Sequence, residues 1–244
     1  MDETARDLLR AKAEKERAEA AKHQADVIVA NLQADLYRQS LEGGRITLDK
    51  ALRTEKDELA ANKYHHVYIF DSSVTSGSVS ACIQQLTLWT RSTPNCDIEI
   101  VFNSPGGSVI DGLALFDFIQ SIRKRGHKVT TSTIGYAASM AGILLQAGDV
   151  RVMGKQSWLL IHEASFGAGG KIGEVEDTVE WVKRVMKRVI NIFAERCQAT
   201  NAPKKLTKRQ IAANWKRKDW WISSDEALDF GLIDAIGPGH SEEI

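Results

Sequence analysis

The sequence predicts an α/β domain with a largely parallel sheet, preceded by a helical N-terminal arm. The first observation is that, from about Tyr64 onwards, short β-branched and aromatic runs alternate with segments of helical periodicity, which is the pattern of parallel strands joined by helices. The second is that residues 3–22 are mostly Ala, Glu, Lys and Arg, which form helices readily. We therefore expect a charged helical arm at residues 1–63 and a compact domain at residues 64–244.

The arm carries a narrow apolar stripe at helical spacing. Its members are Ala25, Ile28, Val29, Leu32 and Leu36. The pair Gly43-Gly44 predicts the end of this helix, and a second helix is expected from Thr47 to Leu59, with Thr47 as its N-cap. Because the stripe is too short for a coiled coil, a solvated helical arm is favoured over an assembly or docking element.

The first half of the domain contains alternating strands and helices. Val67–Phe70 is an apolar run that predicts a strand, and Ser76–Trp89 has one apolar helical face. Asp97–Phe102 shows the alternating apolar residues of a strand. The turn sequence Asn-Ser-Pro-Gly-Gly then leads into a helix expected at Val109–Lys124, and the next strand is expected at Val129–Ile134.

The second half starts with a short apolar helix, expected to begin around Ser139. The elements expected after it are a strand pair at Val150–Met153 and Trp158–Ile161, a long helix with an apolar stripe at Gly173–Thr200, a capped helix at Glu226–Phe230 and a final strand at Leu232–Ile236. The segment Lys204–Lys218 holds seven basic residues and no acidic one, which we interpret as a solvated basic face.

Composition restricts the class of protein. Lys+Arg and Asp+Glu are both 32, so the net charge is zero and no general attraction to nucleic acid or to acidic membranes is expected. Three cysteines without metal-ligand spacing suggest reduced thiols and a cytoplasmic protein. No signal peptide and no run of membrane-spanning length is apparent, so we expect a protein that is neither exported nor inserted.

Ser139 is the candidate nucleophile. It follows a β-branched strand, lies among small residues in the sequence Gly-Tyr-Ala-Ala-Ser-Met-Ala-Gly, and is expected in the first turn of a helix. The unpaired N–H groups and partial positive charge of a helix N-terminus favour a developing anion. The alternative is a serine that only caps the helix, and such caps are far commoner than nucleophiles.

Acyl transfer by a serine also needs a general base, a group that orients the base, and donors for the oxyanion. His162 is the candidate base, because it ends an apolar strand and can reach a cleft; a hydrogen-bonded structural histidine is the alternative. The candidate donors are the backbone N–H of Met140 and one from Gly106-Gly107. The glycine pair is also compatible with plain turn chemistry or a phosphate cradle, although neither a Gly-x-Gly-x-x-Gly nor a P-loop pattern is present.

Several motifs occur in a fixed order: NSPGG at 103–107, GYAASM at 135–140, LIH at 160–162, DWWISSDEA at 219–227 and GLID at 231–234. In these motifs the chain resembles ClpP, the proteolytic subunit of the Clp protease, over about three quarters of its length. The resemblance implies a ClpP/crotonase-type fold of repeated ββα units with a long handle helix. It also implies a Ser-His-Asp serine endopeptidase that uses no metal or other cofactor and assembles into homo-oligomeric rings around a closed chamber.

The resemblance assigns roles position by position. Ser139 falls on the nucleophile, His162 on the base and Asp219 on the orienting acid. Gly107 and Met140 fall on the oxyanion donors. The long helix after residue 173 becomes the handle by which the rings of the family pair.

Sequence context also favours Asp219 as the orienting acid. The rival acids in the second half are Asp177, Asp225, Asp229 and Asp234. Asp219 opens an apolar Trp-Trp-Ile run, so we expect its carboxylate to be partly buried at the start of a strand. An ion pair with Lys216 or Lys218 is the alternative.

The chain departs from the family pattern in two places. Its arm is much longer than the N-terminal loops of the family, and Glu163-Ala164 stands where the family usually has Gln-Pro. These differences resemble the ClpP-like proteases of tailed phages, which mature capsids. The expected partners are therefore polypeptide substrates, further copies of the chain, and either a AAA+ unfoldase or capsid proteins; for a phage-encoded enzyme the compartment is the host cytoplasm.

Two other functions are compatible with the same fold. They are a crotonase-like enzyme acting on acyl-CoA and a non-catalytic scaffold. Neither needs the combination of Ser139, His162 and Asp219, so the endopeptidase is favoured. A third alternative is an enzyme like a signal-peptide peptidase, with a Ser-Lys dyad. Such an enzyme is expected to have a membrane-spanning segment, and none is apparent in the sequence.

Overall fold

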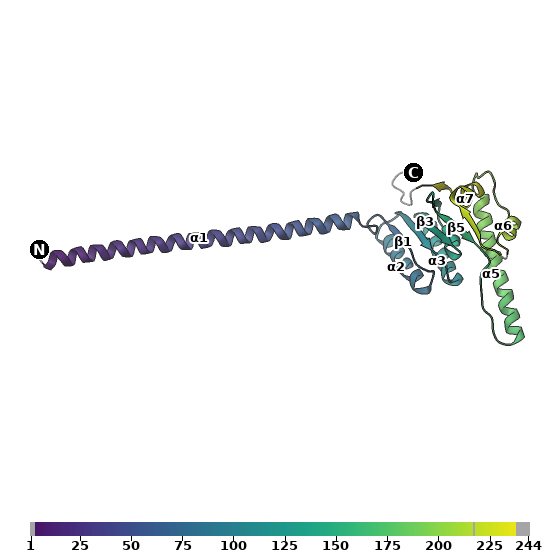
Figure 1. Cartoon of the computed structure of the whole chain (residues 1–244), viewed down its shortest axis with the longest axis horizontal. Helices are drawn as coiled ribbons and strands as arrows, with labels where there is room; N and C mark the ends of the chain where they lie inside the picture. Colours follow the sequence, from purple (N-terminus) through teal and green to yellow (C-terminus); the bar gives the residue numbers. More distant parts are fainter. Residues whose placement is uncertain (1–2, 217, 238–244) are drawn as a thin grey trace. The chain divides into compact units, whose positions relative to one another are not determined.

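The computed structural model describes residues 3–216 and 218–237. Its internal contacts divide the chain into two units, of which the first ends at Ala60 and the second begins at Ala61. Helix α1 (Glu3–Ala60) makes up the first unit, and the sheet with its helices makes up the second (Figure 1).

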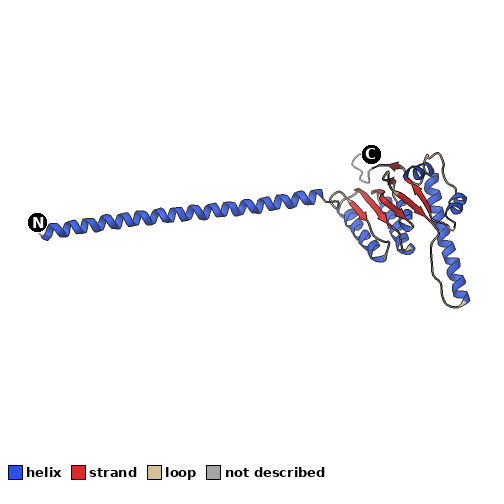
Figure 2. Ribbon diagram, viewed as in Figure 1, coloured by secondary structure: helices blue, strands red, loops and turns tan. Residues whose placement is uncertain are grey.

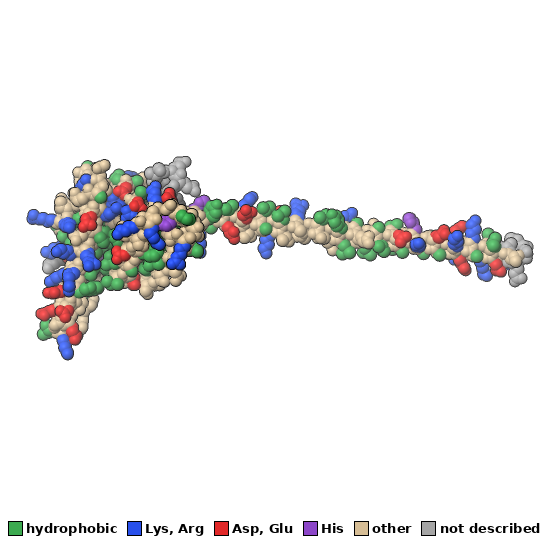
Figure 3. All heavy atoms as spheres, turned by 180° about the vertical axis from the view of Figure 1, so that it is seen from behind, with side chains coloured by type: hydrophobic (Ala, Val, Ile, Leu, Met, Phe, Trp, Pro, Cys, Tyr) green, Lys and Arg blue, Asp and Glu red, His purple; other side chains and the backbone are tan. Residues whose placement is uncertain are grey.

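α1 is a continuous helix of 58 residues, so the predicted break at Gly43-Gly44 and the separate helix from Thr47 are wrong. A glycine inside a helix costs about 1 kcal/mol relative to alanine, but neither glycine adopts the left-handed backbone that commonly ends helices. Thr47 does not cap a new helix; its hydroxyl donates to the Gly43 carbonyl (2.9 Å). The described side chains of α1 are exposed, and acidic and basic groups are interspersed along it (Figure 3). Within the described residues, no helix is both long and apolar enough to cross a membrane.

The second unit confirms the predicted α/β class. Its strands are β1 (Val67–Phe70), β2 (Asp97–Ser104), β3 (Lys128–Ala138), β4 (Val150–Met153), β5 (Trp158–Ile161), β6 (Trp220–Ser223) and β7 (Ala235–Ile236). Its helices are α2 (Ser76–Ser92), α3 (Val109–Lys124), α4 (Met140–Leu145), α5 (Ile172–Gln198), α6 (Lys208–Trp215) and α7 (Ser224–Phe230). Figure 2 shows the strands side by side, with α2 and α3 along them.

The seven-stranded sheet has the order β1-β2-β3-β4-β7, and β5 joins it through β3 while β6 pairs with β5. Every pairing is parallel except that of β5 with β6. β4 and β5 were expected as a pair, but each pairs with a different part of β3, namely Thr130–Thr133 and Tyr136–Ala138. Gly135 lies between these two parts of β3 and has a φ of 71°, which glycine adopts readily. The bend at this residue directs the two parts of β3 to different partner strands.

α6 was not predicted, because the basic residues around it dominated the interpretation of that segment. Its start carries a recognisable signal: Thr207 and Gln210 form a reciprocal capping box. Its apolar side, Ile211 and Trp215, is buried. The segment is therefore a short amphipathic helix with an inner face and a basic outer face.

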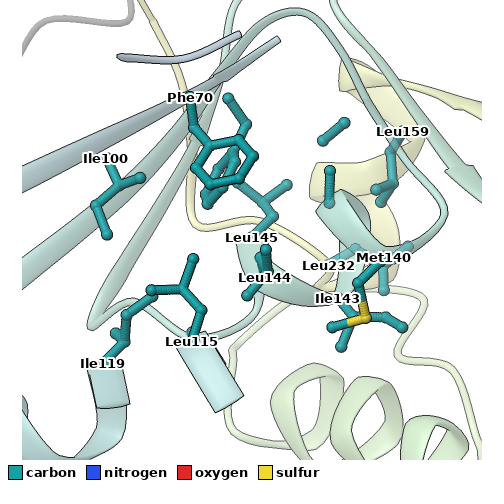
Figure 4. Close-up of a cluster of buried hydrophobic side chains, with 14 of the residues drawn as sticks. Phe70, Ile100, Leu115, Ile119, Met140, Ile143, Leu144, Leu145, Leu159 and Leu232 are labelled. Atoms are coloured by element: carbon teal, nitrogen blue, oxygen red, sulfur yellow. The ribbon is translucent and has the colours of Figure 1, made fainter. Parts of the chain in front are cut away.

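The core lies between the helices and one face of the sheet. Alternate residues of β2 (Ile98, Ile100 and Phe102) face α2, α3 and α4 there. Each of the six residues of α4 is buried, and Figure 4 shows Leu144 and Leu145 of this helix beside Phe70 and Leu115. Because α4 is anchored in the core, the residue just before it, Ser139, has a firmly held backbone.

Candidate active site

Ser139 stands in the tight turn between β3 and α4. Its backbone has φ 55° and ψ −120°, a left-handed conformation that costs a non-glycine residue about 1–3 kcal/mol and is often found at functional sites. The turn is held from both sides: the Ser139 N–H donates to the Leu160 carbonyl (2.9 Å), and the Ser139 carbonyl accepts from the Gly142 N–H (3.0 Å). Ser139 precedes the helix rather than lying in its first turn, and its side chain makes no capping hydrogen bond. Ser139 thus occupies the N-cap position of α4, but its hydroxyl does not cap the helix.

The Gly106-Gly107 turn lies directly against the Ser139 turn. Gly106 has φ 84°, and a Cβ placed on it would lie 2.7 Å from both the Met140 nitrogen and the Ser139 Cβ. Only glycine allows this approach. The structure thus brings the two predicted donor segments to the same side of Ser139.

Among the residues that the structure describes, no hydrogen bond engages either of the two candidate N–H groups. Beside Gly107, the Gly106 carbonyl accepts from Val74 N–H and the Ser108 N–H donates to the Val74 carbonyl, both at 2.8 Å. In such a parallel bridge the N–H of Gly107 itself points away from Val74. Met140 is the first residue of α4, so its N–H is one of the donors that a helix leaves unpaired.

His162 follows the last residue of β5 and lies in the same cleft as Ser139. The cleft has a volume of about 700 Å³ and is also lined by Gly106 and Gly107. Among the residues that the structure describes, the His162 Nε2 atom is buried and has no hydrogen-bond partner. No hydrogen bond therefore joins it to Ser139 Oγ, although both side chains line the same cleft.

The register of the β5–β6 pair brings Asp219 to His162. Ile161 pairs with Trp220, so the next residues outwards on the two antiparallel strands are His162 and Asp219. Their Nδ1 and Oδ1 atoms are 3.6 Å apart, which is within reach for an ion pair but too long for a hydrogen bond. The side chain of Asp219 is 64% exposed. The expected burial is therefore wrong, because Asp219 stands before the first residue of a strand that has a neighbour on one side only.

The rival acids for which the structure gives ion pairs are engaged elsewhere. Asp225 pairs with Lys155 (2.6 Å), Asp229 with Lys204 (2.7 Å) and Asp234 with Arg151 (2.7 Å). Of the described acidic groups, Asp219 alone is within ion-pair distance of His162. No ion pair of Asp219 with Lys216 or Lys218 is found among these residues.

Cys96 and His127 form a second pair of side chains that could in principle act as nucleophile and base. The Cys96 Sγ and His127 Nδ1 atoms are 3.4 Å apart. Burial, with the charge of Asp97, raises the pKa of the Cys96 thiol, so the thiolate that would attack is disfavoured. Cys96 also precedes β2, whereas the Gly106-Gly107 turn follows it, so the length of a strand separates this pair from the cleft. Within residues 3–216 and 218–237, no three His, Cys, Asp or Glu side chains are grouped so that they could hold a metal ion.

One part of the site was missed from the sequence. A small apolar cavity adjoins Ser139 and His162, and Trp215 at the end of α6 forms part of its wall. The capping box at Thr207 and the spacing of Ile211 and Trp215 could have indicated a helix there. Which cavity the helix would line depends on its packing against α5, about which the local pattern carries no information.

Comparison with known proteins extends over this whole domain. Residues 54–240 match the Clp protease family. The chain is 34% identical over 187 residues to the ATP-dependent Clp protease proteolytic subunit 1 of Chlamydia pneumoniae, an alignment that covers 75% of this chain and 90% of that protein. The residues matched to the family contain the Ser139 turn, the glycine turn and the β5–β6 pair, within a fold of the kind the sequence predicted. The chain therefore belongs to the Clp protease family.

Proposed function

We propose that the chain is a serine endopeptidase in which Ser139 is the nucleophile, His162 the general base and Asp219 the group that orients it. The backbone N–H groups of Gly107 and Met140 form the oxyanion hole. The observation that carries the proposal is the contact between the Ser139 turn and the Gly106-Gly107 turn in a cleft that also contains the unpartnered Nε2 of His162. A strained strand-to-helix turn that presents a serine beside free N–H groups is what acyl transfer requires.

The first half of the reaction forms an ester. Ser139 Oγ bonds to the carbonyl carbon of the peptide while its proton passes to His162 Nε2. The carbonyl oxygen becomes an oxyanion, which accepts hydrogen bonds from the Gly107 and Met140 N–H groups. The C–N bond then breaks, the amine leaves with the proton from His162, and the acyl group remains on Ser139.

The second half releases the acid. A water molecule gives a proton to His162 and bonds to the ester carbon, and the breaking C–O bond returns that proton to Ser139 Oγ. Asp219 accepts a hydrogen bond from Nδ1–H, which keeps Nε2 free for the serine proton. For this, the Nδ1–Oδ1 separation of 3.6 Å must shorten and a hydrogen bond must form between Nε2 and Ser139 Oγ, a tightening that commonly accompanies substrate binding.

Labelling with a fluorophosphonate separates this proposal from its alternatives. We expect one adduct, on Ser139, found by mass spectrometry of the intact chain and its peptides. Ser121, exposed on α3, provides the control: Ser121→Ala keeps the adduct and Ser139→Ala loses it. A crotonase-like enzyme or a scaffold would leave Ser139 unlabelled, and that result would refute the peptidase.

Asp219→Asn should lower the rate of peptide hydrolysis by about 10³–10⁴-fold, because the amide favours the wrong tautomer of His162. Asp225→Asn is the matched control: its partner Lys155 and its own side chain are more than half exposed, and an exposed pair of this kind contributes at most about 1 kcal/mol to stability. The rates of the two variants are compared on one fluorogenic peptide. Equal activity of Asp219→Asn and the unsubstituted chain would show that the site works as a Ser-His pair.

We propose that homo-oligomers form through α5. This helix has an acidic first half and a basic second half, and one exposed row contains Glu176, Glu180, Lys183 and Lys187 at helical spacing. Two antiparallel copies would align Glu176 with Lys187 and Glu180 with Lys183, in both directions at once. Such a self-complementary surface is what a two-fold interface requires.

Charge reversal tests the α5 interface. The double variant Lys183→Glu, Lys187→Glu should reduce the mass measured by light scattering. Four acidic side chains of one copy would then face four acidic side chains of the other, and the two helices would repel each other. Adding Glu176→Lys and Glu180→Lys reverses the pattern as a whole and should restore the original mass. A chain that is monomeric at micromolar concentration and still hydrolyses peptides well would contradict the proposal.

α1 should be dispensable for the cleavage of short peptides. No described residue of this helix is buried, and the candidate site residues all lie in the second unit. A chain beginning at Tyr64 is expected to retain kcat/KM for a fluorogenic peptide within about twofold, because an exposed segment that makes no core contact can be removed without loss of the fold. If this chain assembles but has lost peptidase activity, α1 is part of the active machinery.

For folded substrates we propose a AAA+ unfoldase as the partner that delivers the polypeptide. The support is the name of the Chlamydia pneumoniae relative, which describes the proteolytic subunit of an ATP-dependent protease. The family match begins at residue 54, so most of α1 is an addition to the matched region. The alternative partner is a phage head, and in that case we propose that α1 docks to the capsid proteins.

A further inference from the structure

An apolar cavity lies directly beside Ser139 and His162. Its walls come from α4, α5 and α6, with Met140, Phe193 and Trp215 as their large side chains. Its volume is about 20 Å³, which is room for about one water-sized group. The cavity is therefore large enough for a methyl group and too small for a long or aromatic side chain.

A second apolar space lies behind its wall. This groove, between α5, α6 and the segment that follows β5, has a volume of about 460 Å³ and is lined by apolar side chains such as Phe166 and Ile190. Ala164, Met186 and Trp215 line both spaces. These three residues form the partition between the small cavity and the groove.

Trp215 is the dominant part of this partition. It has the largest side chain of the three and is 3% exposed, at the last position of α6. The capping box at Thr207 fixes where α6 begins, and the buried Ile211 anchors the helix one turn before Trp215. The indole is thus held in the partition by a short helix, and α4 and α5 close the cavity from the other sides.

We propose that Trp215 limits the size of the substrate side chain on the acyl side of the scissile bond, so that the enzyme cleaves after small apolar residues such as alanine. The inference rests on the proposed function. An acyl carbon bound near Ser139 Oγ, with its oxygen towards Gly107 and Met140, places its own side chain at the cavity that adjoins both Ser139 and His162. Replacing Trp215 by a smaller residue joins the cavity to the groove and makes room for larger side chains.

The test uses three fluorogenic peptides that differ only in the residue before the scissile bond, which is Ala, Leu or Phe. The unsubstituted chain should cleave the Ala peptide with the highest kcat/KM. Trp215→Ala should raise the Phe-to-Ala ratio of kcat/KM by about 10- to 100-fold, the range by which an apolar pocket discriminates side-chain size. Trp215→Leu should change it less, in the same direction. Trp158→Ala is the matched control, because Trp158 is half exposed on β5 and lines neither space.

Circular dichroism and fluorophosphonate labelling of Ser139 verify that each variant is folded and competent. If Trp215→Ala does not fold, Trp215→Leu and Met186→Ala, which thins the same partition, must raise the ratio. The proposal is overturned if the unsubstituted chain prefers Phe to Ala, or if folded, labelled variants keep its ratio; either result leaves the serine peptidase intact. An unsubstituted chain that neither labels at Ser139 nor cleaves any of the peptides refutes the proposed function itself, and the size limit with it.

Discussion

Ser139→Ala is expected to lower kcat/KM for peptide hydrolysis by about 10⁴–10⁶-fold, since removal of a serine nucleophile leaves only the contribution of binding and the oxyanion hole. The fold should be unaffected. Alanine has the same Cβ as serine, so the backbone strain at φ 55° is unchanged, and among the described residues no hydrogen bond depends on the hydroxyl. The measurement is hydrolysis of a fluorogenic peptide, accompanied by thermal unfolding and light scattering of the same preparation.

The result discriminates between a catalytic and a structural serine. Loss of activity with an unchanged Tm and an unchanged mass identifies Ser139 as the nucleophile. Near-normal turnover by purified Ser139→Ala would remove the basis of the mechanism. A parallel loss of activity and of Tm would instead indicate that Ser139 matters for the fold.

Asp234→Ala is expected to destabilise the domain by about 3–5 kcal/mol, because it leaves a buried guanidinium without its counter-ion. Arg151 on β4 is 1% exposed, and its Nε and Nη2 atoms donate to the two oxygens of Asp234 at 2.9 and 2.7 Å. Its Nη1 atom donates to Gln146 Oε1 and to the carbonyls of Gly231 and Leu232. The ion pair therefore ties the segment after α7 to the central sheet.

Urea unfolding measures this loss, with Asp225→Ala as the control. The Asp225–Lys155 pair has similar N–O distances of 2.6 and 2.8 Å. Its side chains, however, are 69% and 61% exposed, and exposed pairs typically contribute about 0–1 kcal/mol. We expect the midpoint to fall markedly for Asp234→Ala and little for Asp225→Ala. Equal small effects would mean that Arg151 finds another partner or solvent in the variant.

The same pair predicts how stability depends on pH. Burial alone would raise the pKa of Asp234, but the hydrogen bonds and the charge of Arg151 outweigh it and lower the pKa. A carboxyl whose pKa is lower in the folded state stabilises the fold above its unfolded pKa of about 3.9, and this stabilisation disappears as the pH falls through the folded value. The free energy of unfolding should therefore decrease on acidification below about pH 4, and the decrease should be shallower for Asp234→Ala.

Local signals in the sequence were sufficient for most elements of the domain. β1 and α3 have the predicted bounds, Val67–Phe70 and Val109–Lys124, since each is an apolar pattern closed by clear turn residues. The capped helix predicted at Glu226–Phe230 is also present; Ser223 caps it, and α7 begins at Ser224, two residues before the expected start. Such signals depend on residues within one turn or strand, so they can be recognised without knowledge of the fold.

Other features depend on partners that are far away in the sequence. The break predicted at Gly43-Gly44 does not occur, because a glycine ends a helix only where the backbone also turns left-handed. β4 and β5 were recognised as strands, but which part of β3 each pairs with depends on the bend at Gly135. Asp219 was expected to be partly buried because of its apolar neighbours, but its side chain is 64% exposed because β6 pairs with one strand only.

For the candidate site, the sequence by itself determined which residue types occur and in what local context: a serine among small residues, a histidine at a strand end, a glycine turn and an acid before a strand. The tertiary structure alone decided their geometry. It placed Ser139 in a left-handed turn against Gly106, set 3.6 Å between His162 and Asp219, and brought Trp215 to the cavity beside them. The physical reason is that residue type is a local property, whereas distance, strain and cavity size result from how α4, α5, α6 and the β5–β6 pair pack around one another.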